Sequence, residues 1–212
     1  MSLKILVTGG AGFIGSNIVD ACIAAGHEIA VVDDLSSGSR DNLHPDASFY
    51  KVDIRTSELG AVFAQEMPDV VQHLAAQMDV RRSVAEPQFD ADVNIIGSIN
   101  VLENCVKHKT SKIVFASTGG AVYGEPTELP VSEEHLSAPI CHYGVSKRAV
   151  EYYTKLYRHL YGLRYTILRF PNVYGPRQSP HGEAGVCAIL ASLMLKGKSP
   201  ILYGHGLPLR DY

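Results

Sequence analysis

The glycine-rich turn near the N-terminus constrains the fold of this chain more than any other feature. An apolar run, KILV at 4–7, predicts a buried strand, and it leads directly into TGGAGFIG at 8–15, after which a helical pattern begins. Glycines at these spacings permit a tight turn, let the backbone approach a pyrophosphate and aim helix N–H groups at it. A tight corner without a ligand is the simpler interpretation, but the strand and helix on either side favour a dinucleotide site.

Short β-branched runs alternate with helical patterns along the rest of the chain, which predicts βαβ units and a parallel sheet. We therefore expect an α/β fold, a Rossmann-like doubly wound parallel sheet with helices on both faces. The nearly continuous apolar runs at 4–7, 29–32 and 112–115 predict strands that are buried on both faces. Predicted strands lie at 3–8, 29–33, 48–52, 69–74, 112–117 and 165–170, with a short one near 201–203, and predicted helices at 13–25, 56–66, 90–108, 143–161 and 184–196.

Two longer segments, 118–142 and 171–183, are rich in Gly, Pro and Ser and are predicted to be loops. Each follows a predicted strand at its carboxyl end, which is where open α/β sheets bind ligands. We expect one domain over 1–170 and the start of a small C-terminal region over 171–212.

Composition excludes several classes of protein. The 212 residues are 46% apolar and 19% charged, which rules out a disordered or collagen-like chain. The formal net charge of −3 gives no reason to expect a nucleic-acid partner. No apolar stretch reaches membrane-spanning length, so no membrane association is expected. The four cysteines are scattered without a C-x-x-C pair and no histidines have H-x-x-x-H spacing, so we expect reduced thiols, no metal site and a cytoplasmic protein.

The second predicted strand ends in Asp33-Asp34, 18 residues after Gly15. A carboxylate at this place accepts hydrogen bonds from the adenosine ribose hydroxyls and repels a 2′-phosphate. The pattern therefore favours NAD over NADP, although the two aspartates would equally suit the start of a turn.

Tyr143 and Lys147 are four residues apart and share one face of a predicted helix. A nearby ammonium stabilises a phenolate, so this pair could make the tyrosine a general acid or base. Taken alone, such a pair is more often a solvated surface pair. Ser117 and Thr118 end the fifth predicted strand, at the edge where the nicotinamide of a bound cofactor would lie.

Together these motifs resemble the short-chain dehydrogenase/reductase superfamily. The chain is most similar to its extended branch of NAD-dependent nucleotide-sugar epimerases and dehydratases, and within that branch to the UDP-glucose 4-epimerases. The resemblance spans essentially all 212 residues. It is carried by GGAGFIG at 9–15, DDLSSG at 33–38, DIR at 53–55, HLAAQ at 73–77, Asn94, the Tyr143/Lys147 pair, RFPNVYGPR at 169–177 and RDY at 210–212.

The resemblance implies ligand contacts at particular residues. For each apolar one, ordinary core packing is as good an interpretation as direct contact. The implied NAD contacts are Gly9, Gly12, Phe13, Ile14, Asp33, Asp53, Ile54, Leu74, Ala75, Ala76, Asn94, Tyr143 and Lys147, and the implied UDP-sugar contacts are Thr118, Asn172, Val186, Tyr203 and Arg210.

The implied reaction is epimerisation at C4 of a UDP-hexose, the interconversion of UDP-glucose and UDP-galactose in galactose metabolism, through a transient 4-ketose. Tyr143 would take the proton of the sugar 4-hydroxyl, and Lys147 would hold the nicotinamide ribose and lower the tyrosine pKa. The family's bridging Ser or Thr usually stands at the place of Gly119, and we assign this role to the adjacent Thr118. The resemblance also implies a homodimer built on the helices at 90–108 and 143–161, whose apolar stripes would otherwise be buried within one copy.

Other interpretations remain open from the sequence. A 4,6-dehydratase needs an Asp-Glu pair where Gly120 and Ala121 stand, so it ranks below an epimerase. A reductase or an epimerase of uronic or N-acetylated sugars belongs to the same branch. Members of the family continue well beyond the RDY motif, so the chain is expected to be a fragment, a short form with an open and weakly active sugar site, or a non-catalytic NAD-binding protein.

Overall fold

A six-stranded parallel sheet forms the centre of the structure. The computed structural model describes residues 2–126, 128, 130–181, 185–201 and 204. The strand order is β3-β2-β1-β4-β5-β6, and every neighbouring pair is parallel. The order reverses between β1 and β4, which is where such sheets bind ligands. The strands are β1 (Lys4–Thr8), β2 (Glu28–Val32), β3 (Ser48–Tyr50), β4 (Val70–His73), β5 (Lys112–Thr118) and β6 (Arg164–Phe170).

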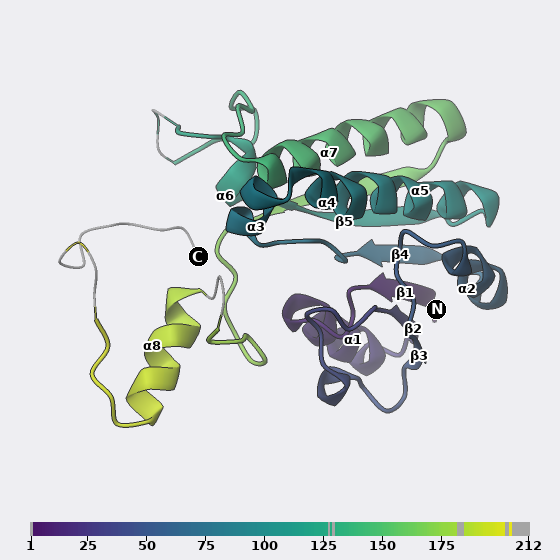
Figure 1. The fold of residues 1–212 in the computed structure, drawn as a ribbon. Coiled ribbons are helices and arrows are strands. Elements are labelled where there is room, and N and C mark those ends of the chain that lie inside the picture. Colours follow the sequence, from purple (N-terminus) through teal and green to yellow (C-terminus); the bar gives the residue numbers. More distant parts are fainter. Residues whose placement is uncertain (1, 127, 129, 182–184, 202–203, 205–212) are drawn as a thin grey trace.

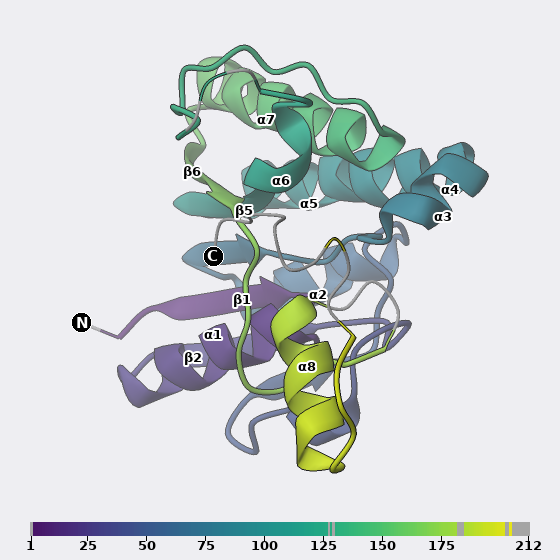
Figure 2. The same cartoon turned by 90° about the vertical axis from the view of Figure 1, so that its left-hand side faces the viewer.

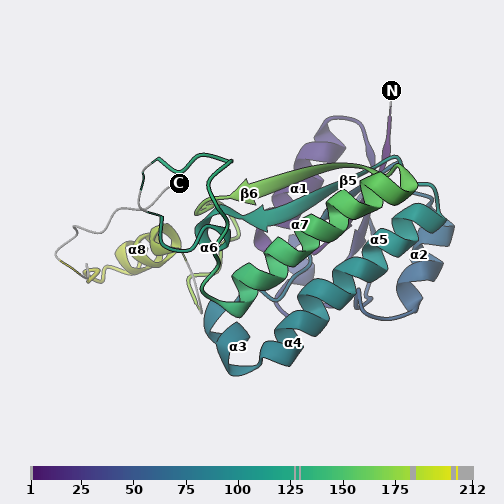
Figure 3. The same ribbon diagram turned by 90° about the horizontal axis from the view of Figure 1, so that it is seen from above.

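Helices cover both faces of the sheet, as the alternating pattern predicts. Helix α1 packs on β1 and β2, while α2, α5 and α7 lie side by side on the other face (Figures 1 and 3). Helix α8 lies apart from these layers in Figure 1, and in Figure 2 it is in front of them. The helices are α1 (Phe13–Ala24), α2 (Glu58–Glu66), α3 (Val80–Ala85), α4 (Pro87–Ala91), α5 (Gly97–Lys107), α6 (Gly119–Val122), α7 (His142–Tyr161) and α8 (Val186–Leu195), with a 3-10 turn η1 (Arg40–Asn42) and a π-helical turn η2 (Asp92–Ile96).

The core has one apolar cluster on each side of the sheet. Ile5 and Val7 of β1 meet Val19 of α1 on one side, and Leu6 meets residues of α2, α5 and α7 on the other. After their first residues, β1 and β2 are buried throughout. Burial of this apolar surface is the main force that holds the layers together.

The prediction that β5 is buried on both faces was wrong. Burial alternates along the strand: Ile113, Phe115 and Ser117 are buried, and the residues between them are only half-buried. Leu168 in the neighbouring β6 is 39% exposed. Helix α7 packs on β5 and β6 from one side, and the described residues cover their other face incompletely.

Several helix boundaries also differ from the predictions. The helix expected over 90–108 is divided into the end of α4, the π-helical turn η2 and α5, and α6 begins inside the predicted loop 118–142. The strand expected near 201–203 does not include Ile201, and residues 202 and 203 lie outside the described residues. β6 ends at Phe170, and the domain boundary expected there stays a prediction.

Across the described residues, no helix is both long and apolar enough to span a bilayer.

Candidate active site

The glycine turn after β1 has a geometry that few other residues could adopt. Gly9 has φ +74°, and a Cβ there would lie 2.7 Å from the backbone nitrogen of Ala75. A Cβ on Gly15 would overlap the carbonyl oxygen of Gly9. These close approaches bring the start of α1 against the ends of β1 and β4.

The N-terminus of α1 suits a phosphate group. Gly12 occupies the N-cap position, and no side chain caps this end of the helix. The N–H groups of the first turn, at Phe13 and Ile14, have no intrahelical acceptors, and the helix dipole favours an anion beside them. The donor set and the glycine cradle therefore fit a pyrophosphate.

Asp33 braces this turn from the end of β2. One carboxylate oxygen accepts a hydrogen bond from the Ala11 N–H (3.0 Å), and the other accepts one from the Leu35 N–H (2.8 Å). The residue is 8% exposed, and its burial raises the pKa of the carboxyl group. Each oxygen keeps further lone pairs, so the predicted contact with a ribose hydroxyl is compatible with this bracing role.

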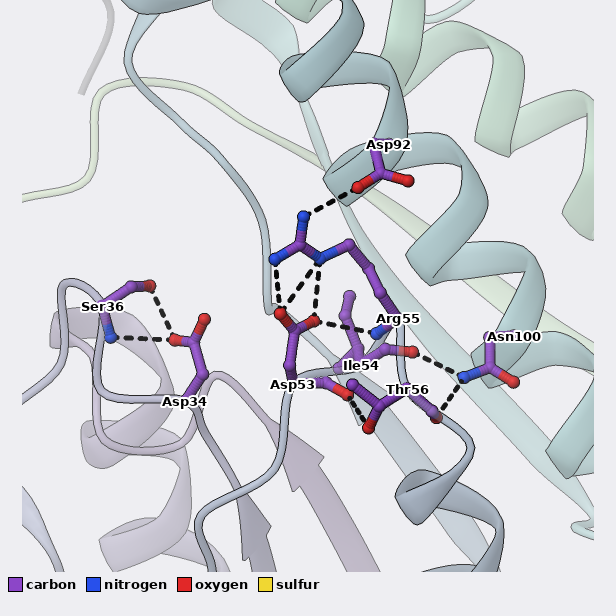
Figure 4. Close-up of polar contacts among 8 residues, drawn as sticks. All are labelled: Asp34, Ser36, Asp53, Ile54, Arg55, Thr56, Asp92 and Asn100. Carbon is purple, nitrogen blue, oxygen red and sulfur yellow. Dashed lines mark hydrogen bonds and ion pairs between the residues drawn. The ribbon is translucent and has the colours of Figure 1, made fainter.

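Asp53 follows β3 and is held by an arginine (Figure 4). Arg55 Nε lies 3.0 Å from both carboxylate oxygens, and its Nη2 lies 2.5 Å from Oδ2. This hydrogen bonding lowers the pKa of Asp53. The neighbouring Ile54 is buried in the core against Gly97, so its side chain serves packing and only its backbone could meet a cofactor.

The predicted contacts Leu74, Ala75 and Ala76 leave β4 beside the glycine turn. The Ala75 N–H donates to the Thr8 hydroxyl (3.3 Å), which also contacts His73 Nδ1 (2.7 Å). His73 Nε2 lies 2.8 Å from the Ser98 hydroxyl, and burial lowers the histidine pKa to about 3. His73 is thus a neutral core residue, and it ties β1, β4 and α5 together.

Asn94 lies in the π-helical turn and uses its amide on protein groups. Its Oδ1 accepts from the Gln77 N–H, and its Nδ2 donates to the Gln77 carbonyl and to Asp90, all at 2.9 Å. Both amide N–H groups are therefore occupied, which leaves one acceptor lone pair for the predicted cofactor contact. Asp90 also accepts a hydrogen bond from the Ser146 hydroxyl (2.6 Å), one residue before Lys147. Sequence reasoning missed this buried network.

The predicted Tyr143 and Lys147 pair is brought together at the start of α7. Lys147 is 4% exposed, and its Nζ donates to the Ala116 carbonyl (2.9 Å) and lies 5.9 Å from the centroid of the Tyr143 ring. Burial lowers the lysine pKa to about 8, while the charge of Asp90 acts in the opposite direction. This lysine is not a solvated surface residue, which removes the simpler interpretation of the pair.

Thr118 is the last residue of β5 and is half-buried. Successive strand residues point to opposite faces, so its side chain lies on the other side of the sheet from that of Ser117. The Ser117 hydroxyl donates to Glu151 of α7 (2.6 Å). A Cβ at Gly119 would lie 3.3 Å from the carbonyl oxygens of Arg169 and Phe170, a tight fit that explains a glycine at this position.

Sequence reasoning also missed the buried ion cluster behind Thr118. Glu151 accepts hydrogen bonds from Arg148 (2.5 Å) and from Arg169 Nε (2.8 Å) and Nη2 (2.7 Å). Arg169 Nη1 then donates to the Tyr123 hydroxyl (2.7 Å). Burial opposes ionisation of Glu151, but these partners outweigh it and lower its pKa to about 2. The cluster ties α7 and β6 to the segment after β5.

The structure describes only part of the predicted sugar-binding set. Asn172 is exposed after β6, and Val186, at the first residue of α8, is 42% exposed. Tyr203 and Arg210 lie outside the described residues.

Comparison with known proteins identifies the family of this chain. The model of the NAD dependent epimerase/dehydratase family matches residues 5–212. The chain belongs to this family. Its members are NAD-dependent enzymes, so the family supplies both the cofactor and the enzyme class that the motifs indicate.

Individual relatives place the chain among the nucleotide-sugar epimerases. It is 44% identical over 215 residues to the UDP-glucose 4-epimerase of Mycolicibacterium smegmatis, with 99% of this chain and 69% of the relative covered. The UDP-glucose 4-epimerase of Thermotoga maritima, solved with UDP-glucose, shares 48% identity at a TM-score of 0.95, with 99% of this chain and 69% of that one covered. The UDP-glucose 4-epimerase of Thermus thermophilus, solved with NAD, shares 47% identity at a TM-score of 0.89, with coverages of 94% and 64%.

Proposed function

We propose that this chain carries the NAD site and the catalytic groups of an epimerase that inverts C4 of a UDP-hexose, with UDP-glucose and UDP-galactose as the pair. One observation carries the proposal: the buried Lys147 Nζ lies 5.9 Å from the Tyr143 ring at the same end of the sheet as the glycine turn. The chain spans 64% to 69% of the length of the three relatives, so the activity is proposed for the machinery that this part of the protein contains.

The glycine turn and the start of α1 would hold the pyrophosphate of NAD, and Asp33 would accept from its ribose hydroxyls. When bound, NAD supplies a reversible hydride acceptor for C4 of the sugar. Tyr143 would take the proton of the 4-hydroxyl as the 4-ketose forms, and would return it after the sugar has turned in the site. The Lys147 ammonium stabilises the phenolate that this exchange requires.

Thr118 would bridge the sugar hydroxyl and Tyr143. The role falls to Thr118 because the adjacent Ser117 hydroxyl is already engaged by Glu151 of α7. Since the Thr118 side chain lies on the other side of the sheet, its hydroxyl would have to meet Tyr143 around the end of β5. A dehydratase is disfavoured because Gly120 and Ala121, where that reaction needs an acid and a base, supply neither.

We further propose that α7 forms the contact between two copies of the chain. The apolar stripe of α7 consists of Val150, Tyr153, Leu156, Tyr157 and Leu160. Val150 and Tyr157 are buried within a single copy, while Tyr153, Leu156 and Leu160 are 37%, 45% and 56% exposed. An exposed apolar stripe on a helix suits burial against a second copy. Light scattering on the protein should give twice the monomer mass, and a monomer at all concentrations would contradict the proposal.

A cytoplasmic location likewise stays a proposal, tested by fractionating cells.

The reaction is tested by incubating the protein with UDP-galactose and NAD and resolving the nucleotide sugars by anion-exchange chromatography. UDP-glucose should form without net NADH. A parallel incubation with UDP-N-acetylglucosamine tests whether an N-acetylated sugar is the better substrate. If neither sugar is converted while NAD binds, the proposed activity is wrong for this chain.

A further inference from the structure

Asp90 is a fully buried carboxylate that is surrounded by hydrogen-bond donors. Its Oδ1 accepts from Asn94 Nδ2 (2.9 Å) and Gln77 Nε2 (3.1 Å), and its Oδ2 accepts from the Ser146 hydroxyl (2.6 Å). The residue is 0% exposed. An ionised carboxylate accepts hydrogen bonds and donates none. Three donors around this buried carboxylate therefore match its charged form.

Backbone N–H groups orient the two amide side chains of this network. The Gln77 N–H donates to Asn94 Oδ1 (2.9 Å), and the Asp79 N–H donates to Gln77 Oε1 (2.6 Å). Because an N–H group holds each amide oxygen, each amide nitrogen points the other way, toward Asp90. The backbone thus sets the polarity of the network, which requires an acceptor at residue 90.

Asp90 connects this network to the turn that carries Lys147. It belongs to α4, which lies beside α7 (Figure 3), and its hydrogen bond to Ser146 joins the two helices. Ser146 immediately precedes Lys147, whose Nζ donates to the Ala116 carbonyl. The turn of α7 is therefore held by α4, and the ammonium that it presents is held by β5.

The charge of Asp90 also acts on Lys147. Burial lowers the pKa of Lys147 to about 8, and the charge of Asp90 opposes this effect. Around the ammonium, α7 presents Tyr143, β4 presents His73, and β5 presents the Phe115 ring, 4.9 Å from Nζ. Burial and, to a smaller degree, the charge of Lys147 lower the pKa of His73 to about 3. This histidine is therefore neutral and adds no charge beside the lysine.

Other acids on α7 and on the elements packed against it have partners of their own. The pairs are Glu151 with Arg148 and Arg169, Asp92 with Arg55, Glu86 with Arg82, and Glu103 with the Tyr157 hydroxyl. Asp90 has no such cationic partner among its described hydrogen bonds, which leaves Lys147 as the charge that it balances.

We propose that Asp90 is a positioning residue, which anchors the first turns of α7 through Ser146 and provides the counter-charge of the Lys147 ammonium. The inference rests on the role proposed above for Lys147 beside Tyr143. It assigns Asp90 no contact with NAD, the sugar or the reacting atoms. Without this carboxylate, the lysine would lose its proton at a lower pH, and with it the charge that stabilises the phenolate.

The test is the titration of Lys147, followed by NMR on protein that carries ¹³C at the lysine Cε positions. The Lys147 signal is assigned by its absence from Lys147→Met. The wild-type midpoint should lie near pH 8, whereas a buried lysine without a counter-charge titrates at about pH 5–6. In Asp90→Asn the midpoint should fall by about one pH unit.

Asparagine suits this test because it can keep all three contacts of Asp90. Its Oδ1 can accept from Asn94 and Gln77 as before, and its Nδ2 can donate to Ser146 Oγ once that hydroxyl turns away. The variant therefore removes the charge and leaves the network connected. Urea unfolding checks that it is folded.

Two variants serve as controls. Ser146→Ala removes one donor to Asp90 and keeps the charge, so the Lys147 midpoint should stay at the wild-type value. Asp92→Asn makes the same chemical change as Asp90→Asn two residues further along, where the side chain is 50% exposed and paired with Arg55 (2.7 Å). Solvent screens such a charge, so this midpoint should also be unchanged.

Turnover of UDP-galactose gives a second readout. At pH 8, kcat of Asp90→Asn should be about 5-fold below wild type, because about a tenth of the lysine is charged there in place of about half. At pH 6 the two proteins should have similar kcat values. A purely structural role for Asp90 would lower kcat equally at both pH values.

Two results would overturn the inference. A wild-type midpoint at or below about pH 6 would show that Lys147 has no effective counter-charge, and this measurement holds even if Asp90→Asn does not fold. A folded Asp90→Asn with the wild-type midpoint would show that the charge of Asp90 does not act on the lysine. The titration uses neither NAD nor sugar, so the proposed epimerase activity is judged separately, by UDP-glucose formation from UDP-galactose.

Discussion

Lys147 Nζ donates a 2.9 Å hydrogen bond to the carbonyl oxygen of Ala116, and this contact joins the first turns of α7 to β5. The ammonium is buried, yet its pKa of about 8 keeps it mostly protonated at neutral pH. Because the backbone oxygen fixes its position, the charge stays beside Tyr143 instead of moving into solvent. The pair is therefore preorganised before any ligand binds.

Tyr143→Phe removes the proposed proton-transfer group while keeping the ring. We expect kcat for UDP-galactose to fall by about 10²- to 10⁴-fold, the usual contribution of general acid–base catalysis. NAD affinity, measured by calorimetry, should change little. Tyr165→Phe, at the opposite end of the sheet in β6, is the control and should keep wild-type kcat. Comparable losses in both variants would contradict the role of Tyr143.

Alanine substitution should affect turnover at Thr118 and folding stability at Ser117. Thr118→Ala should lower kcat by about 10-fold or more, since it removes a hydrogen bond to the reacting hydroxyl, and Thr118→Ser should restore most of it. Ser117→Ala removes the buried donor to Glu151 and should lower the free energy of unfolding by about 1–3 kcal/mol. Urea unfolding and turnover of both variants check this, and unchanged turnover in Thr118→Ala would show that the bridging role belongs elsewhere.

Gly144 allows α6 to pack against the first turn of α7. A Cβ there would lie 2.5 Å from the Ala121 carbonyl oxygen and 2.9 Å from Pro139 Cβ. Gly144→Ala should therefore displace the turn that carries Tyr143. The loss in kcat, expressed as a free energy, should exceed the loss in the free energy of unfolding. Val145→Ala, which alters an exposed neighbour, is the control. Full turnover in Gly144→Ala would show that this contact does not position Tyr143.

His73 should make the folded state sensitive to acid. Its folded pKa of about 3 lies below the ordinary value of 6.5, so the unfolded chain binds the extra proton between these two pH values. The stability that neutral His73 provides is complete above pH 6.5 and is lost as the pH falls toward 3. Between pH 7.5 and 5.0 the expected loss is about 2 kcal/mol in the free energy of unfolding.

Urea denaturation of the wild type and His73→Gln at the two pH values measures this loss. The variant cannot take up the proton, so its stability should depend on pH less steeply by that amount. Equal slopes for the two proteins would mean that His73 does not carry the acid sensitivity.

Local sequence was enough to predict the elements that depend on short-range chemistry. In the turn at 8–15, a Cβ on Gly12 or Gly15 would meet the carbonyl oxygen of Gly9 within the turn itself. The elements β1, α1 and β2 lie within a residue or two of their predicted ranges. Tyr143 and Lys147 share a helix face because four residues make about one turn. Membership of the epimerase/dehydratase family, expected from motifs in this order, is confirmed by the family match.

Tertiary structure alone decided how the buried polar groups are paired. Ser146 meets Asp90 across 56 residues, and Ser117 meets Glu151 across 34, while periodicity indicates only that such positions face inward. The same limit explains why β5 was wrongly predicted to be buried on both faces, since an apolar run does not show whether a helix covers it. A buried polar or charged group requires partners, and the folded chain supplies them from segments whose proximity no local pattern encodes.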